Sequence, residues 1–473
     1  MDVIYDVLDM IGKDYEYINP AKINLHDKKV YEIFRNGMTN GIFQFESEGM
    51  KKTLIKMKPT TLDDLAVANA LYRPGSMKYI DNYIKRKHGE EKFEYLHPDL
   101  EPILNSTYGI IVFQEQLIEI GKIANLRNPD EIRKACAKKI PEKMAKLEPE
   151  LKSGLLNRGW SQEQVNRLWD DIIEFTRYSF NKSHSYAYAL IAYITAFLKV
   201  YHPTEYVCAM FNSFEGKNEK LGLCWEEAKR LNVKIEPFDY KNTSPLCKVV
   251  NNKIIIGTSM IKECNRQLAY DLTKVSQNKY KYFVELLAAI INNTSIQSNQ
   301  IEILIKLGFF SEFGNSGKLY MIYQEFKNGK NRYKKDHKQE TKEKRLKELI
   351  DFEQNLENKK MNLIESLKFE KQFLGSIVSV FPNLKSDYSL VLNIDDKYSP
   401  KIELYDLKTG EIKLLKIDKK NYYDEGKVPK FKVGDILKNI KIEKRKKIIP
   451  QNGKWTKLDE EEEWIVGCSI IKQ

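Results

Sequence analysis

The sequence has few of the residues that build metal sites and disulfide frameworks. Its 473 residues include six cysteines and six histidines, and no cysteine or histidine pair lies at the spacing of zinc ligands. The cysteines are scattered at positions 136, 208, 224, 247, 264 and 468. This scatter argues against a structural zinc site and against a disulfide framework, and it is typical of a reducing compartment.

Long apolar runs and a targeting segment are also missing. No stretch approaches the roughly 20 apolar residues that span a bilayer. Met1 is followed by Asp2-Val3-Ile4-Tyr5-Asp6, which lacks the basic region of a signal peptide. We therefore expect a cytoplasmic protein with no membrane partner.

Short catalytic motifs with a known mechanism are equally scarce, because the sequence has no P-loop, no HExxH and no GxSxG. What remains is ordinary globular composition, with 42% hydrophobic and 30% charged residues, in a chain long enough for two to four domains. Lys and Arg outnumber Asp and Glu by 78 to 66, a net charge of +12. Such a balance favours a polyanionic partner, although lysine-rich coding alone can also produce it.

The first half of the chain has a helical pattern. Residues 128–131 form a helix start, with an Asn cap, a Pro in the first turn and two acids, and Pro141 is expected to end this helix. Its cations form a band down one side: Arg133, Lys134, Lys138 and Lys139. Residues 186–201 are almost uncharged and apolar on all sides, which predicts a buried helix.

The residue pattern changes in the second half of the chain. Asn251-Asn252 between two short β-like runs predicts a hairpin, and short helices are expected over 259–314. A basic, solvated helical segment is expected from Lys327 to about Lys360. From about residue 370 the pattern alternates with period two, with turns at 408–410 and 451–453, which suggests a small antiparallel barrel or sandwich.

Six segments, in this order, resemble the fingers of the C-family bacterial replicative DNA polymerases, the DNA polymerase III alpha subunits. They are residues 41–50 (GIFQFESEGM), 70–75 (ALYRPG), 86–89 (RKHG), 107–116 (TYGIIVFQEQ), 133–139 (RKACAKK) and 180–185 (FNKSHS). Residues 373–382 also resemble the family's entry to its last domain. The order of six motifs across some 150 residues makes the resemblance specific.

The resemblance implies a multidomain protein in which a mainly α fingers region is followed by a tandem helix-hairpin-helix module and a C-terminal antiparallel β OB-like barrel. The expected boundaries are 1–240 for the fingers, 241–325 for the hairpin and helix-hairpin-helix module, 326–365 for a basic helical linker, and 366–473 for the OB-like domain.

In that family the fingers bind the triphosphate of the incoming nucleotide and the templating strand. The resemblance therefore assigns phosphate contacts to six cations: Arg133, Lys134, Lys138, Lys139, Arg73 and Lys182. A solvated basic helix is the plain alternative for the first four. His184 is either a general acid for the pyrophosphate or a structural residue beside a helix cap at Asn181 or Ser183, and His88 is expected to order a loop. The polar residues Gln44, Glu46, Gln114, Glu115 and Gln116 are read as structural hydrogen-bonding groups.

The sequence also departs from the family. The three palm aspartates that hold two Mg²⁺ ions there have no match here, because Asp2, Asp6 and Asp9 belong to a helix that follows the third of them. No catalytic or metal-ligating residue is therefore assigned, Mg²⁺ is expected only together with a palm-bearing partner, and it stays uncertain whether the chain is itself an enzyme. The glycine-rich turn of the first helix-hairpin-helix is replaced by residues 261–265 (IKECN), and no clamp-binding peptide is evident, so duplex and sliding-clamp binding stay open.

Three hypotheses follow. The first is the C-terminal part of a DNA-directed DNA polymerase, a nucleotidyltransferase of DNA replication, that binds deoxynucleoside triphosphates and DNA and works with a separate N-terminal polymerase half. The second is a non-catalytic protein that binds single-stranded nucleic acid through the OB-like domain and the basic linker, although its aromatic residues Tyr405, Tyr422 and Tyr423 form no clear stacking stripe. The third is a relic without a function of its own.

Overall fold

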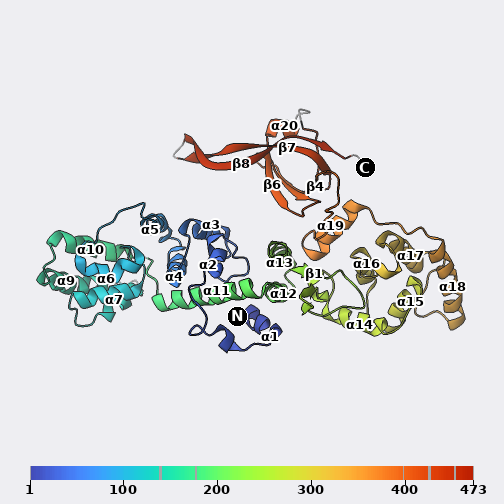
Figure 1. Ribbon diagram of the computed structural model, residues 1–473, viewed down its shortest axis with the longest axis horizontal. Coiled ribbons are helices and arrows are strands. Elements are labelled where there is room, and N and C mark those ends of the chain that lie inside the picture. The colour runs from blue at the N-terminus through green and yellow to red at the C-terminus, as the bar shows by residue number, and fades with distance from the viewer. Residues whose placement is uncertain are drawn as a thin grey trace. The chain divides into compact units, whose positions relative to one another are not determined.

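The computed structural model describes residues 2–137, 141–175, 178–397, 399–423, 428–451 and 454–471, and Figure 1 shows its helices and strands. The chain divides into two compact units, Met1–Ser213 and Phe214–Gln473. The first unit thus ends before residue 240, where the sequence pattern placed the end of the helical domain.

In its described residues the first unit is helical. Several helices begin at side-chain caps: Asp27 accepts from the amide of Lys29, and Thr61 forms a reciprocal capping box with Asp64. The helices are α1 (Asp2–Met10), α2 (Lys28–Arg35), α3 (Glu48–Met57), α4 (Leu62–Leu71), α5 (Ile80–Lys87), α6 (Glu101–Leu104), α7 (Gln114–Ile123), α8 (Asp130–Ala137), α9 (Pro141–Asn157), α10 (Gln162–Phe175), α11 (Lys182–Tyr201) and α12 (Pro203–Ser213).

Two apolar cores support this unit. One joins α2 to α5 with α11 and contains the fully buried Phe34, Phe45 and Tyr193. The other joins α6 to α10 around Leu117, Leu151 and Phe175. Figure 1 shows α6, α7, α9 and α10 gathered apart from α2, α3 and α4. Residues 107–113 and 178–180 contribute to both cores, since Phe113 and Phe180 lie in the first, whereas Ile111 and Tyr178 pack in the second.

Helix α11 differs in part from its prediction. From Ala192 to Leu198 it is buried except for the half-buried Phe197, as expected for an apolar helix. The two ends of the predicted stretch 186–201 are different, because Ala187 and Tyr201 are exposed and Tyr186 and Tyr188 are half-buried. The prediction of a helix buried on all sides is therefore wrong at these ends. Ser183 and His184, which precede the stretch in the first turn of α11, are also exposed.

The second unit begins with α13 (Asn218–Arg230) and a three-stranded sheet in the order β1-β3-β2, from β1 (Lys234–Ile235), β2 (Lys248–Val250) and β3 (Lys253–Ile255). The hairpin between β2 and β3 is confirmed, and both Asn251 (φ 50°) and Asn252 (φ 58°) adopt the left-handed conformation that such a tight turn needs. Six helices follow: α14 (Arg266–Ser276), α15 (Phe283–Asn293), α16 (Ser298–Lys306), α17 (Ser316–Asn328), α18 (Gln339–Asn355) and α19 (Leu363–Leu374).

The basic helical segment from Lys327 to about Lys360, which was expected to be a solvated linker, is only partly exposed to solvent. Helix α18 buries Leu349 completely and leaves Glu353 5% exposed. The Glu353 carboxylate accepts from the amides of Phe283 (2.9 Å) and Val284 (3.0 Å) at the start of α15. Because these contacts fix α18 on α15, the segment belongs to the helical module.

The last part of the chain is a closed barrel in the order β4-β5-β6-β8-β7. Its elements are β4 (Tyr388–Asp395), β5 (Lys401–Asp406), β6 (Ile412–Ile417), α20 (Lys419–Tyr423), β7 (Ile436–Gln451) and β8 (Lys454–Ile470). Strands β6 and β8 pair in parallel, and the other four pairs of neighbouring strands are antiparallel. A closed five-stranded barrel with this order agrees with the expected OB-like domain. The turn at 408–410 is confirmed, with Gly410 at φ 74°, whereas the turn at 451–453 lies largely outside the described residues.

Within the part of the chain that the structure describes, no helix is both long enough and apolar enough to cross a bilayer.

Candidate functional site

The candidate site forms where the starts of α7 and α11 meet. Phe113 and Phe180, each next to one of these starts, form an isolated parallel bridge, and the amide of Gln114 donates to the Phe180 carbonyl at 2.8 Å. Segments 66 residues apart in sequence are thereby held side by side. Both helices point the positive ends of their dipoles toward this bridge.

Glu115 and Asn181 lock the start of α11. Glu115 accepts from the Asn181 side-chain amide (2.9 Å) and from the backbone amide of Lys182 (2.8 Å). Asn181 in turn accepts from the amide of His184 at 2.8 Å. Asn181 is therefore the helix cap, one of the two candidates that the sequence offered.

Gln116, Gln114 and Glu46 are confirmed as structural hydrogen-bonding groups. The buried Gln116 accepts from the amides of Val112 (2.8 Å) and Phe113 (2.9 Å) and donates to the Thr107 hydroxyl and the Ile103 carbonyl. Gln114 donates to the Ser179 hydroxyl, and Glu46 accepts from the amide of Gly41. These polar side chains order the loops beneath the site.

Two of the expected phosphate-binding cations lie at the bridge. The guanidinium of Arg73 stacks on the Phe180 ring at 3.6 Å from its centroid. The Lys182 ammonium lies 5.8 Å from the Phe113 ring and 5.4 Å from the Tyr186 ring. Partial desolvation lowers the pKa of Arg73, but an arginine stays charged at neutral pH. The aromatic rings hold both cations in place without neutralising them.

His184 joins this group through its ring. It contacts Phe180 at 5.6 Å and Tyr188 at 4.2 Å between ring centroids, and Tyr188 stacks on Phe43 at 5.4 Å. Phe43 is 49% exposed. Arg73, Phe180, His184, Tyr188 and Phe43 thus contact one another in a row. The sequence did not predict this arrangement, because its members come from three distant segments. The phenylalanine at position 43 of the 41–50 motif was the one signal that the sequence offered.

The other expected cations lie on α8, which packs against α7 through Ile132 and Ala135. Arg133 contacts Asp130 at 2.5 and 3.2 Å, and Lys134 contacts the same carboxylate at 3.0 Å. Arg133 and then Lys134 lower the pKa of Asp130 to about 2. Hydrogen bonding to Asp130 raises the pKa of Arg133, and the charge of Glu115 adds to that rise. Lys138 and Lys139 lie outside the described residues.

His88 has the structural contact expected of it, since its Nε2 lies 3.1 Å from the Lys56 carbonyl. The neighbouring cations of that motif are also occupied. Arg86 pairs with Glu91 and donates to the Tyr108 carbonyl, and Lys87 pairs with the buried Asp64 at 2.5 Å. Arg86 and Lys87 are thus both paired with acids of the first unit.

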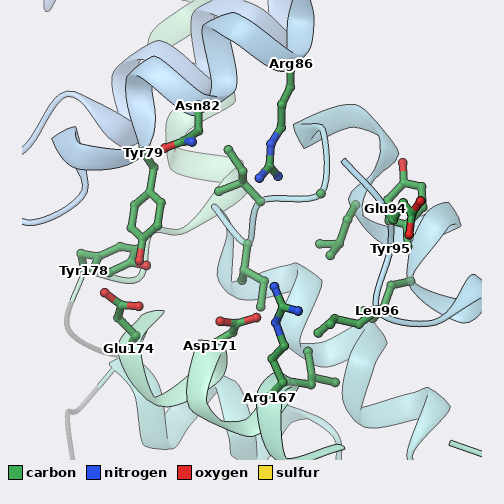
Figure 2. A pocket seen from close by; sticks show the side chains of 16 residues that line it. Tyr79, Asn82, Arg86, Glu94, Tyr95, Leu96, Arg167, Asp171, Glu174 and Tyr178 are labelled. Atoms are coloured by element: carbon green, nitrogen blue, oxygen red, sulfur yellow. The ribbon is translucent and has the colours of Figure 1, made fainter. Parts of the chain in front are cut away.

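A cavity of about 560 Å³ opens between α5 and α10. Figure 2 shows Arg167 and Asp171 of α10 facing Arg86 of α5 across it, with Tyr79 and Tyr178 at one side. Burial raises the pKa of Asp171, and the charge of Arg167 opposes this rise. The lining of the cavity also includes Glu94 and Glu174. Together with Asp171, these acids would repel a triphosphate. A polyanion therefore fits better at the bridge between Phe113 and Phe180, where Arg73 and Lys182 lie, than in this cavity.

Among the described residues, no group of three or more His, Cys, Asp or Glu side chains could hold a metal ion. We therefore assign no Mg²⁺ ligand to the described part of this chain.

The barrel aromatics named in the sequence are engaged elsewhere. Tyr405 is fully buried and donates to the Ser379 carbonyl at 2.8 Å. Tyr422 packs on Phe431 at 5.8 Å, and the side chain of Tyr423 lies outside the described residues. The fully buried Tyr405 is thus not placed to stack on a nucleobase, whereas Tyr422 is half-buried.

Comparison with known proteins identifies the relatives of this chain. Residues 1–159 match the family model of the bacterial DNA polymerase III alpha subunit finger domain. The DNA polymerase III alpha subunit of Aquifex aeolicus is 39% identical over 302 residues, which are 62% of this chain and 26% of the relative. That of Campylobacter jejuni is 34% identical over 434 residues, 87% of this chain and 35% of the relative. That of Ureaplasma parvum is 36% identical over 324 residues, 66% and 33% of the two chains. The chain thus spans about a quarter to a third of the length of these relatives.

Proposed function

The chain carries the finger domain of bacterial DNA polymerase III alpha subunits, and from this premise we propose that it binds the incoming nucleotide and the template–primer DNA during template-directed DNA synthesis. The observation that carries the proposal is that Arg73 and His184 contact the Phe180 ring, while Lys182 lies over the ring of Phe113, the bridge partner of Phe180. The relatives support a role in DNA replication. The position of the nucleotide and the assignment of these residues are our own proposal.

The triphosphate is the part of the nucleotide that this cluster suits. Arg73 offers a planar fork of donors for phosphate oxygens, whereas Lys182 acts as a point charge. The amides at the start of α11 are largely engaged by Asn181 and Glu115, so the side-chain cations carry the contact. Charge that develops on the departing pyrophosphate would be stabilised by the same groups.

Arg133 and Lys134 of α8 would extend the cationic surface. In the free protein both pair with Asp130, and these pairs are partly exposed. A phosphate with more than one charge can compete with a single carboxylate for such cations. Lys138 and Lys139 are proposed as further contacts on the family resemblance alone.

The chemical step needs groups that we do not assign to this chain. Mg²⁺ would supply the charge that activates the primer hydroxyl and stabilises the leaving oxygens. We propose that a palm-bearing polypeptide contributes its carboxylate ligands, while the residues described above bind and orient the nucleotide.

Primer extension tests this proposal. This chain, a palm-bearing polypeptide from a related alpha subunit, and their mixture are each incubated with primed template, Mg²⁺ and four deoxynucleoside triphosphates. Extension in the mixture alone is the expected result. Extension by this chain alone would refute the assignment of the metal ligands elsewhere, and no extension in any sample, with binding of single-stranded DNA by the barrel, would favour a non-catalytic binding protein.

A further inference from the structure

The cavity between α5 and α10 has no role in the proposed function. Its volume of about 560 Å³ suits a small organic molecule. It lies between the two apolar cores of the first unit, since Ile110 of the first core and Ile111 of the second both line it. A ligand in this cavity would therefore contact both groups of helices.

Much of the cavity wall is apolar. Five aliphatic side chains line it, each at most 9% exposed: Leu100, Leu104, Ile110, Ile111 and Leu168. The rings of Tyr79 and Tyr178, whose centroids are 5.3 Å apart, stand at one side of the cavity (Figure 2). Aliphatic side chains and aromatic rings together favour a ligand with a flat, apolar body.

Two charged side chains of α10 reach into the cavity. Figure 2 shows Arg167 and Asp171 pointing from α10 toward α5. They are four residues apart, which places them side by side on the helix surface, and both are exposed. Within the residues that the structure describes, neither side chain forms a hydrogen bond or an ion pair. The donors of one and the acceptors of the other are thus available to a ligand.

Other charged groups of the lining are already engaged. Arg86 pairs with Glu91 at 2.7 Å and donates to the Tyr108 carbonyl at 3.0 Å. Glu174 pairs with Lys78. The specific polar contacts of a ligand therefore fall to the two side chains of α10.

A carboxylate beside a guanidinium matches one nucleobase best. The Asp171 carboxylate can accept from two neighbouring N–H groups, and the Arg167 guanidinium can donate to two neighbouring acceptors. Guanine carries its N1 and N2 donors side by side, next to the O6 and N7 acceptors that an arginine fork recognises. Adenine and cytosine each offer a single amino group, so they leave one oxygen of the carboxylate without a donor.

We propose that the cavity binds the base of a guanine nucleoside. The base packs on the aliphatic wall and the tyrosine rings, with its donor edge on Asp171 and its acceptor edge on Arg167. The nucleoside carries no phosphate, because the carboxylates of Glu94 and Glu174 in the lining repel one. The inference goes beyond the proposed function, since it uses none of the cations proposed to hold the triphosphate and needs neither Mg²⁺ nor a palm-bearing polypeptide.

Equilibrium dialysis of the full chain with radiolabelled guanosine tests the inference. We expect saturable binding with a dissociation constant below about 1 mM. Inosine differs from guanosine only in lacking the N2 amino group. It should bind about tenfold or more weakly, because one oxygen of the Asp171 carboxylate is then left without a donor. Guanosine triphosphate should displace labelled guanosine no better than guanosine itself does.

Variants of the chain assign the binding to the cavity. Asp171→Asn keeps the size of the side chain but replaces one acceptor oxygen with a donor, and it should weaken guanosine binding about tenfold or more. The matched control is Asp170→Asn, at the adjacent exposed position of α10, which is not part of the cavity lining. This control, and Arg73→Ala at the bridge, should bind guanosine like the wild type.

The comparison of guanosine with inosine uses the wild-type chain, so it holds whether or not a variant folds. Absence of saturable guanosine binding up to about 1 mM, equal binding of the two nucleosides, or equal binding by Asp171→Asn and the wild type would overturn the inference. Equal weakening by Arg73→Ala and Asp171→Asn would place guanosine at the bridge and overturn it as well. None of these measurements involves primer extension, so the two proposals can fail separately.

Discussion

At the residue scale, Lys199 shows how a buried charge positions the candidate site. Its side chain is fully buried in α11, and its ammonium donates to the carbonyls of Met38 (2.6 Å) and Asn40 (3.1 Å). It also lies 5.5 Å from the Tyr206 ring, whose hydroxyl donates to the same Asn40 carbonyl. These contacts tie the loop that presents Phe43 to the helix that presents His184.

Lys199→Met should therefore destabilise the first unit. Methionine fills a similar volume but leaves two buried carbonyls without this donor, at a cost of about 2 kcal/mol. We expect the unfolding midpoint of this unit to fall by about 4 to 8 °C in a thermal unfolding experiment. Lys52→Met, at an exposed position on α3, is the control. Equal midpoints for Lys199→Met and the wild type would show that the buried ammonium is not needed to hold the loop.

Sequence reasoning worked at residues whose partners lie nearby in the chain. The cap at Asn181 and the hairpin at Asn251-Asn252 each depend on groups within a few residues, so local chemistry specifies them. The stacking of Arg73 on Phe180 joins residues 107 positions apart, and no local pattern encodes it. The family resemblance selected both Arg73 and Lys182 without showing that aromatic rings hold them.

At the element scale, α18 shows where composition misleads. Its lysines made it look like a solvated linker, yet Leu349 and Glu353 occupy the one face that packs. The acceptors and donors of this contact are 69 and 70 residues apart, beyond the reach of a periodicity argument. A carboxylate that caps a distant helix was indistinguishable in the sequence from an ordinary surface glutamate.

Glu353→Ala should loosen α18 from α15. The change removes a buried carboxylate that accepts from two amides at the positive end of α15, and a hydrogen bond to a charged group contributes about 1.5 to 3 kcal/mol. Amide hydrogen exchange should become about tenfold or more faster in peptides from α15 and α18.

Asp351→Ala, an exposed position on the same helix, is the control for that experiment and should leave exchange unchanged. Exchange in Glu353→Ala that matches the wild type would mean that Leu349 alone docks α18.

At the scale of the whole molecule, the sequence predicted a helical region before a β barrel, and the structure has this order. The barrel was predictable because alternation of apolar and polar residues is a local signal. The division after Ser213 was not, because α13 and the segments that follow it carry no composition change at that point. The helix-hairpin-helix character of the region around α14 to α16 stays a prediction.

Under our proposal, the first unit binds the nucleotide at the bridge between Phe113 and Phe180. The assignment rests on Arg73 and Lys182, which aromatic rings of the same unit hold in place. Substitutions of these two cations should therefore act on the nucleotide.

The apparent dissociation constant of the incoming nucleotide tests the central claim most directly. It is measured by single-nucleotide incorporation with a palm-bearing polypeptide for the wild type, Arg73→Ala, Lys182→Ala and the control Lys52→Ala. Loss of a charge-assisted contact should raise the constant about tenfold or more in the first two variants, with primer–template affinity unchanged and the control equal to the wild type. Folded Arg73→Ala and Lys182→Ala proteins that bind the nucleotide as tightly as the wild type would contradict the placement of the triphosphate at the bridge between Phe113 and Phe180.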